Sequence, residues 1–123
     1  MSAPATTTSV DICGWSDLVP ERGVAALVDG QQIAIFRLHD DRVVALQNED
    51  PYSGAMVLSR GLIGTKGDRT VVISPMYKQA FDVVSGECLE TKGGDPRSVT
   101  VYAVRVVDGR VVLEVTRRTG VQL

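Results

Sequence analysis

Short runs of β-branched and other apolar residues follow one another along most of this 123-residue chain, and turn pairs such as Asp29-Gly30 and Asp108-Gly109 separate them. Val and Ile suit the pleated surface of a sheet, and turn signals at short intervals are typical of all-β folds. We therefore predict an all-β domain, an antiparallel barrel or sandwich with little helix. The predicted strands cover residues 24–28, 33–38, 43–46, 70–73, 81–84, 99–107 and 110–115.

The last predicted hairpin is the most sharply defined. Asp108-Gly109 suits a two-residue type I′ turn, because such a turn needs positive φ at both central positions. The turn sets the register, with Val107 opposite Arg110, and side chains then alternate between the two faces. The further predicted pairs are Val106 with Val111, Val104 with Leu113 and Tyr102 with Val115, and these six side chains should share one apolar face.

The pattern gives the following domain organisation. Residues 1–9 are rich in Thr, Ala and Ser and are expected to be a flexible tail, residues 10–116 form the β domain, and residues 117–123 are a second tail. One helical turn is predicted at 17–19, capped by Ser16, with Trp15 beside it as a core or rim anchor.

Composition excludes several classes of function. The net charge of −2 and the aromatic content of 5% supply neither a basic field nor a stacking surface for nucleic acid. No apolar run approaches the roughly 18 residues of a membrane helix, and the first nine residues lack the basic and apolar regions of a signal peptide. We expect a cytoplasmic protein, in which Cys13 and Cys88 are free thiols without partners at zinc spacing.

Two segments stand apart from this strand pattern: residues 50–55 (DPYSGA) and 74–82 (SPMYKQAFD). They are expected to be protruding loops. Their frame resembles the two cluster-binding loops of Rieske iron–sulfur proteins, Cys-Pro-His-x-Gly-Ala and Cys-Pro-x-His-Gly-x-x-Phe-Asp. Asp50 and Ser74 stand at the cysteine positions of that frame, and Tyr52 and Tyr77 at the histidine positions.

A Rieske cluster needs two thiolates and two imidazoles. Neither cysteine lies in these loops, and the single histidine, His39, falls in a predicted turn. One carboxylate, one hydroxyl and two phenols also form a poor cage for other metals. We therefore expect no metal, no cofactor and no catalytic residue on this chain.

The two loop tyrosines have two compatible interpretations. Their rings could fill the volume of the missing cluster and pack the loops together. Alternatively, the loop tips could form a docking surface, since Tyr, Met and Arg are enriched at protein interfaces. The candidate docking residues are Pro51, Tyr52, Met56, Arg60, Met76, Tyr77 and Lys78.

A wider resemblance covers residues 10–115. The stretches LVPERGVAAL (18–27), NEDPYSGAMVLSRGLI (48–63) and SGECLE (85–90) resemble the small subunit of cytosolic NAD(P)H-dependent assimilatory nitrite reductase. That resemblance implies a Rieske-type antiparallel β fold without a cluster. It also implies a large partner subunit that carries FAD, siroheme and a [4Fe–4S] cluster, takes electrons from NADH or NADPH, and reduces nitrite to ammonium in nitrate assimilation.

The sequence leaves two alternative functions to consider. One is a stand-alone Rieske-like interaction module unrelated to nitrite. The other is a ferredoxin-type electron carrier for an oxygenase, against which the four replaced ligand positions argue.

Overall fold

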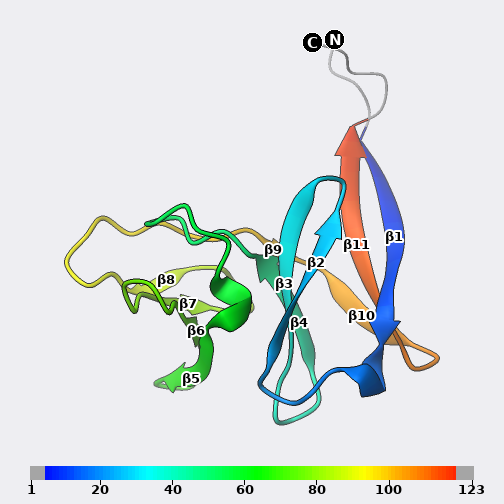
Figure 1. The fold of residues 1–123 in the computed structure, drawn as a ribbon, viewed down its shortest axis with the longest axis horizontal. Helices are drawn as coiled ribbons and strands as arrows, with labels where there is room; N and C mark the ends of the chain where they lie inside the picture. Colours follow the sequence, from blue (N-terminus) through cyan, green and yellow to red (C-terminus); the bar gives the residue numbers. More distant parts are fainter. Residues whose placement is uncertain (1–4, 119–123) are drawn as a thin grey trace.

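Eleven strands and two short 3₁₀ helices make up the computed structural model, which describes residues 5–118 (Figure 1). Each expected segment from 24–28 to 110–115 contains strand, so the all-β prediction is confirmed. The strands are β1 (Ala5–Gly14), β2 (Gly23–Val28), β3 (Gln31–Arg37), β4 (Val43–Gln47), β5 (Leu62–Lys66), β6 (Arg69–Ile73), β7 (Ala80–Asp82), β8 (Cys88–Glu90), β9 (Val101–Tyr102), β10 (Val104–Val107) and β11 (Arg110–Arg118). The helices are η1 (Trp15–Asp17) and η2 (Leu58–Arg60).

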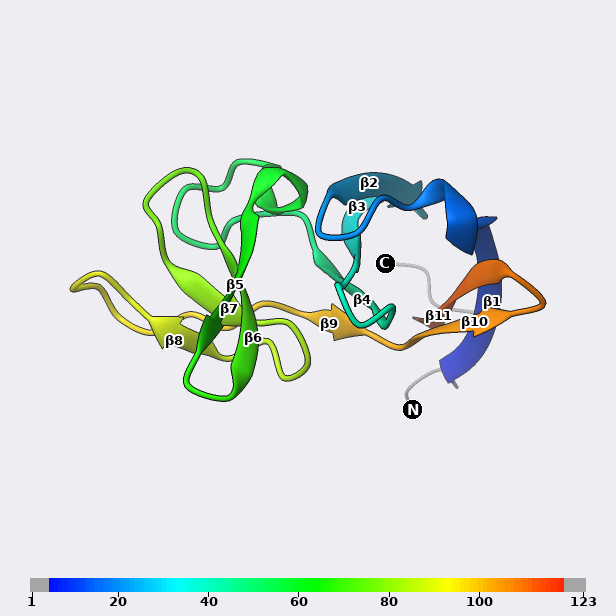
Figure 2. The same ribbon diagram turned by 90° about the horizontal axis from the view of Figure 1, so that it is seen from below.

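The strands form three antiparallel sheets, ordered β1-β11-β10, β2-β3-β4-β9 and β5-β6-β7-β8. The third sheet and the loops beside it form a separate lobe, clearest when the molecule is seen from below (Figure 2). None of the helices in the described part of the chain is long and apolar enough to cross a membrane.

The sheet β2-β3-β4-β9 is the middle layer of the molecule. On β3, Ile33 and Ile35 pack into a cluster with Val111 and Leu113 of β11, on the side of the first sheet. Ala34 and Phe36, which alternate with them, pack into a second cluster with residues of the β5–β8 lobe, including Val72 and Phe81. Burial on both faces explains why this stretch is continuously apolar rather than alternating.

The β10–β11 hairpin has the predicted turn and register as far as Val104. Asp108 and Gly109 have φ of 50° and 76°, and Val107 pairs with Arg110. The predicted pairing of Tyr102 with Val115 is wrong, because the β10–β11 ladder ends at Val104 and Tyr102 pairs with Ala45 of β4. Val106 also departs from the expected buried face, with 44% of its surface exposed.

Strand β1 was not expected. It begins at Ala5, inside the expected N-terminal tail, and pairs with β11 from Ala5–Arg118 to Gly14–Arg110, so residues 117–118 also belong to a strand. Its Thr- and Ser-rich start carries no apolar alternation, and long-range pairing with β11 holds it in the sheet. Residues 1–4 and 119–123, the rest of the two expected tails, lie outside the described residues.

Other local boundaries also differ. The first helical turn spans Trp15–Asp17 rather than 17–19, and it is closed by the Asp17 carboxylate, which accepts the Gly14 N–H at 3.1 Å; Ser16 does not cap it. The strand expected at 81–84 ends at Asp82, because the chain turns there. Trp15 packs against the cluster of the first sheet, and the Arg37 guanidinium lies 3.6 Å from its ring centre.

Candidate functional site

The two loops share the same pattern of backbone hydrogen bonds and the same position of a left-handed residue. In the first, which follows β4, the Asp50 N–H donates to Ala55 O (2.8 Å) and the Gly54 N–H to Asp50 O (2.8 Å). In the second, between β6 and β7, the Ser74 N–H donates to Gln79 O (2.9 Å) and the Lys78 N–H to Ser74 O (3.1 Å). The fifth residue of each loop is left-handed, with φ of 76° at Gly54 and 67° at Lys78. Lys78 thus occupies a conformation that favours glycine, at the position where the Rieske frame has glycine.

Asp50 and Ser74 join the two loops directly. Both are fully buried, and the Ser74 hydroxyl donates to Asp50 Oδ2 at 2.5 Å. Asp50 Oδ1 accepts the Tyr52 N–H at 2.8 Å, and Ser74 Oγ accepts the Met76 N–H at 3.2 Å. A hydroxyl–carboxylate bond therefore links the positions at which the Rieske frame has its two cysteines.

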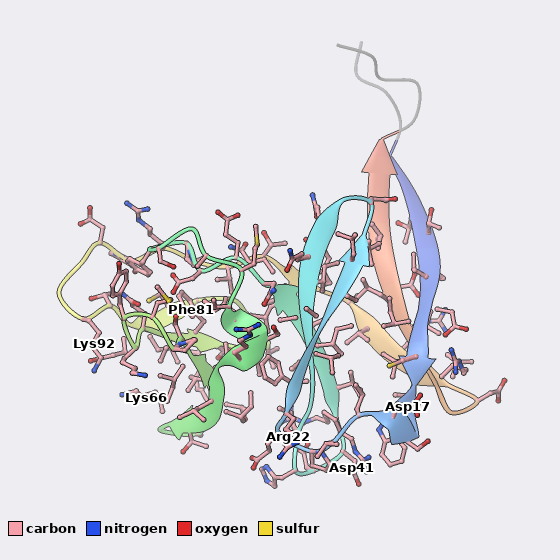
Figure 3. All side chains as sticks on the ribbon, in the orientation of Figure 1. Asp17, Arg22, Asp41, Lys66, Phe81 and Lys92 are labelled. Carbon is pink, nitrogen blue, oxygen red and sulfur yellow. The ribbon has the colours of Figure 1, made fainter. Side chains whose placement is uncertain are left out.

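Tyr52 packs inside the lobe. Its ring centre lies 6.2 Å from that of Phe81, which Figure 3 labels within the β5–β8 lobe. Its hydroxyl donates to Asp95 O at 2.6 Å, accepts the Arg97 N–H at 3.0 Å and lies 3.5 Å from Cys88 Sγ. Burial, followed by the contact with Cys88, raises the pKa of this phenol above its ordinary value. Tyr52 thus fills space and ties the first loop to residues 95–97.

The segment around Arg97 is a part of the site that the sequence gave no reason to select. The Arg97 guanidinium donates to Pro51 O at 3.0 Å and lies 5.6 Å from the Tyr52 ring centre. It comes from the irregular stretch between β8 and β9, 46 residues away from Pro51 along the chain. No pattern of spacing or periodicity marks such a contact.

Tyr77 behaves differently from Tyr52. It is 55% exposed, so the expectation that both tyrosines fill the cluster volume is wrong for Tyr77. Met76 is 44% exposed and Lys78 is also exposed. We call residues 76–78 the loop-tip surface. Of the other candidate docking residues, Met56 and Arg60 are exposed, and Pro51 and Tyr52 are half-buried.

The side chains at the four ligand positions do not fit a [2Fe–2S] cluster. Such a centre needs two thiolates and two imidazoles, whereas here a carboxylate and a hydroxyl bond to each other and one phenol bonds to a backbone carbonyl. The remaining donors are dispersed: the two free cysteines lie on β1 and β8, and His39 lies in the β3–β4 turn, 3.9 Å from Glu21. Within residues 5–118 no three His, Cys, Asp or Glu side chains gather as a metal site.

Three antiparallel sheets with two like-built loops at one end define a Rieske-like domain whose ligand positions have been replaced. The family model described as a Rieske-like [2Fe-2S] domain matches residues 8–114.

Comparison with known proteins identifies a family within this class of Rieske-like domains. The nitrite reductase (NADH) small subunit of Escherichia coli K12 is 45% identical over 104 residues, which cover 84% of this chain and 94% of that protein. A crystal structure of a Mycobacterium tuberculosis chain assigned as an NADH-dependent nitrite reductase small subunit superposes with a TM-score of 0.82 at 45% identity, covering 89% of this chain and 96% of that one. The chain belongs to the family of nitrite reductase small subunits.

A third relative has a different architecture. The nitrite reductase [NAD(P)H] large subunit of Klebsiella oxytoca contains a stretch that is 40% identical to this chain over 100 residues, covering 81% of this chain but 10% of that protein. In that protein a small-subunit-like stretch is therefore part of the large polypeptide.

Proposed function

We propose that this chain is the cluster-free small subunit of an NAD(P)H-dependent nitrite reductase and supports a large catalytic subunit without transferring electrons itself. The observation that carries the proposal is the 45% identity over 94% of the E. coli small subunit, together with the replaced ligand positions. The FAD, siroheme and [4Fe–4S] cluster implied by the resemblance belong to the large subunit, as does the NADH or NADPH site. A cytosolic location is part of this proposal.

The loop-tip surface is the proposed docking site for the large subunit. Tyr77 presents an aromatic ring, a kind of side chain that often dominates binding energy at interfaces, and Met76 presents an adaptable thioether of the kind enriched at binding surfaces. The buried hydrogen bond between Asp50 and Ser74 fixes the base of the second loop. The exposed residues at its tip are therefore in position before a partner binds. Such preorganisation lowers the entropic cost of binding.

The test is the affinity of purified large subunit for variants of this chain, measured by calorimetry. Tyr77→Ala should weaken binding by roughly tenfold or more, because a central aromatic side chain contributes on the order of 2 kcal/mol. Lys78→Asn should weaken it less, and Asn tolerates the left-handed backbone better than Ala would. Tyr52→Ala is not a clean probe, because Tyr52 packs inside the lobe.

Val19→Ala is the matched control, since Val19 is 53% exposed and lies on the η1–β2 connection. Equal affinities for Tyr77→Ala, Lys78→Asn and Val19→Ala would remove the loop tip as the docking site. Growth on nitrite as sole nitrogen source after deletion of the gene separates the nitrite reductase function from an unrelated interaction module, which would leave growth normal.

A further inference from the structure

A groove of about 620 Å³ lies between β1 and β2. Residues 10–13 of β1 and 24–28 of β2 line most of it. β1 ends the three-stranded sheet and β2 ends the four-stranded sheet, so each is paired with a neighbour on one side only. The two strands run in opposite directions and are joined through η1 (Figure 1). The groove is therefore bounded by two unpaired sheet edges.

The free edge of β2 can be assigned by its register. Asp29 and Gly30 have φ of 51° and 78°, and Val28 pairs with Gln31, as in a two-residue hairpin turn. Hydrogen-bonded and non-bonded pairs alternate from such a turn, so the N–H and C=O of Ala25 and Leu27 face away from β3. The backbone bonds outside the ladders, over residues 5–118, include none to Ala25 or Leu27.

This edge is also apolar. Leu27 is 73% exposed and Val24 is 38% exposed, and no charged residue lies within β2. An exposed, uncharged edge strand is a template for pairing with another chain, and proteins that avoid such pairing place charges or proline there. Addition of an extended segment to a free edge is a common mode of peptide recognition.

The charged residues that line the groove indicate which kind of segment would bind there. Its lining contains three carboxylates, Asp11, Asp17 and Asp29, and no lysine or arginine. Asp11 pairs with Arg110 at 3.0 Å. The Asp17 carboxylate accepts a neutral donor, the Gly14 N–H, at 3.1 Å, so the rim keeps the negative charge of Asp17. A second copy of this chain would bring the same carboxylates against these, and like charges across an interface are unfavourable. The lining therefore favours a basic segment over self-association.

We propose that an extended segment of the large subunit, apolar at alternating positions and carrying Lys or Arg, adds as a strand between β1 and β2. The inference rests on the proposed function. The K. oxytoca large subunit, in which a related stretch is part of the same polypeptide, supports a partner of this kind. The added strand would pair with β2 through Ala25 and Leu27 and join the first two sheets.

Ala25→Pro tests the proposal directly. Proline is tolerated on an edge strand where the N–H faces outward, but it removes the donor that an added strand needs. Affinity for purified large subunit should fall roughly tenfold or more. Val106→Pro on β10 is the matched control, because the same alternation from the Asp108-Gly109 turn points its N–H away from β11. Binding by Val106→Pro should equal that of the wild type.

A second pair of variants covers the case in which Ala25→Pro does not fold. Leu27→Lys places a positive charge on a 73% exposed side chain and should weaken binding, whereas Val84→Lys, on a 63% exposed side chain in the β7–β8 turn, should not. Hydrogen exchange on the wild-type complex should show slowed exchange at the amides of Ala25 and Leu27.

Wild-type affinity in both Ala25→Pro and Leu27→Lys, or unchanged exchange at these amides, would overturn the groove proposal while leaving loop-tip docking intact. Dimerisation of the isolated chain that Ala25→Pro abolishes would also overturn it, in favour of a second copy. Failure of the wild-type chain to bind the large subunit would instead overturn the proposed function, and this inference with it.

Discussion

At the scale of single residues, the site is defined by what replaces the cluster ligands. Asp50 and Ser74 keep the two loops joined by one buried hydrogen bond, and Tyr52 packs against Phe81. The identities of these residues at the ligand positions are readable in the sequence. Their contact with each other, and the different environments of Tyr52 and Tyr77, depend on how the two loops meet in space.

Removal of the Ser74 hydroxyl tests the importance of that bond. Ser74→Ala should lower the free energy of unfolding by about 1–3 kcal/mol, because it leaves the buried Asp50 Oδ2 without its donor. Urea unfolding measures the change. Ser16→Ala, at an exposed position, should change it by less than about 0.5 kcal/mol. Equal effects of the two substitutions would contradict a stabilising role for the Asp50–Ser74 bond.

At the scale of secondary-structure elements, the residues of a turn determine the register of its hairpin, whereas pairing between distant strands depends on the tertiary structure. The type I′ turn at Asp108-Gly109 sets the β10–β11 register, and both were predictable because the turn and its flanking residues are contiguous. The change of pairing partner at Tyr102 was not predictable. Tyr102 pairs with Ala45 of β4, which lies 57 positions earlier in the chain. Packing of the whole fold decides whether Tyr102 pairs with β4 or with β11.

The turn that follows β7 is a second structural feature at the scale of secondary-structure elements. The Asp82 carboxylate accepts the backbone N–H groups of Val84 (2.7 Å) and Ser85 (2.9 Å), and Arg69 Nε of β6 donates to it at 2.5 Å. Burial alone would raise the pKa of Asp82, but these donors hold it below the ordinary value of 3.8. Because the folded-state pKa is lowered, the carboxylate stabilises the fold at neutral pH and loses this effect as the pH falls through that pKa.

Asp82→Asn should therefore destabilise the protein at pH 7 by about 1–3 kcal/mol, since the charge-assisted bond to Arg69 is lost. The difference from the wild type should shrink at pH 3, below the ordinary value of 3.8. Urea unfolding at both pH values provides the measurement, with Glu49→Gln as the control at an exposed carboxylate. A difference that is the same at pH 3 and pH 7 would show that the charge of Asp82 is not the cause.

At the scale of the whole molecule, the fold is a Rieske-like scaffold whose two loops are held by contacts within the chain, such as the Asp50–Ser74 hydrogen bond. The middle sheet is packed on both faces by two apolar clusters, one of which reaches under the loops through Phe81 and Leu58. The scaffold thus carries both proposed docking sites, the loop-tip surface and the groove between the open edges of β1 and β2.

Purified protein should accordingly contain far less than one iron and one acid-labile sulfide per chain, and it should lack the visible absorbance of a [2Fe–2S] centre. Iron and sulfide analysis after aerobic and anaerobic purification checks this. Stoichiometric iron in the anaerobic preparation would contradict the structural role proposed here and would favour an electron carrier.

The all-β class, the final hairpin and the four replaced ligand positions follow from the sequence, because periodicity, turn residues and motif spacing are local properties. The pairing of β1 with β11, the Asp50–Ser74 link, the Arg97 contact and the groove beside β2 were decided by the tertiary structure. Each of these joins segments far apart in the chain, or depends on which sheet edge is left unpaired. Such pairings are fixed by burial and backbone hydrogen bonding across the whole fold, which no single stretch of residues encodes.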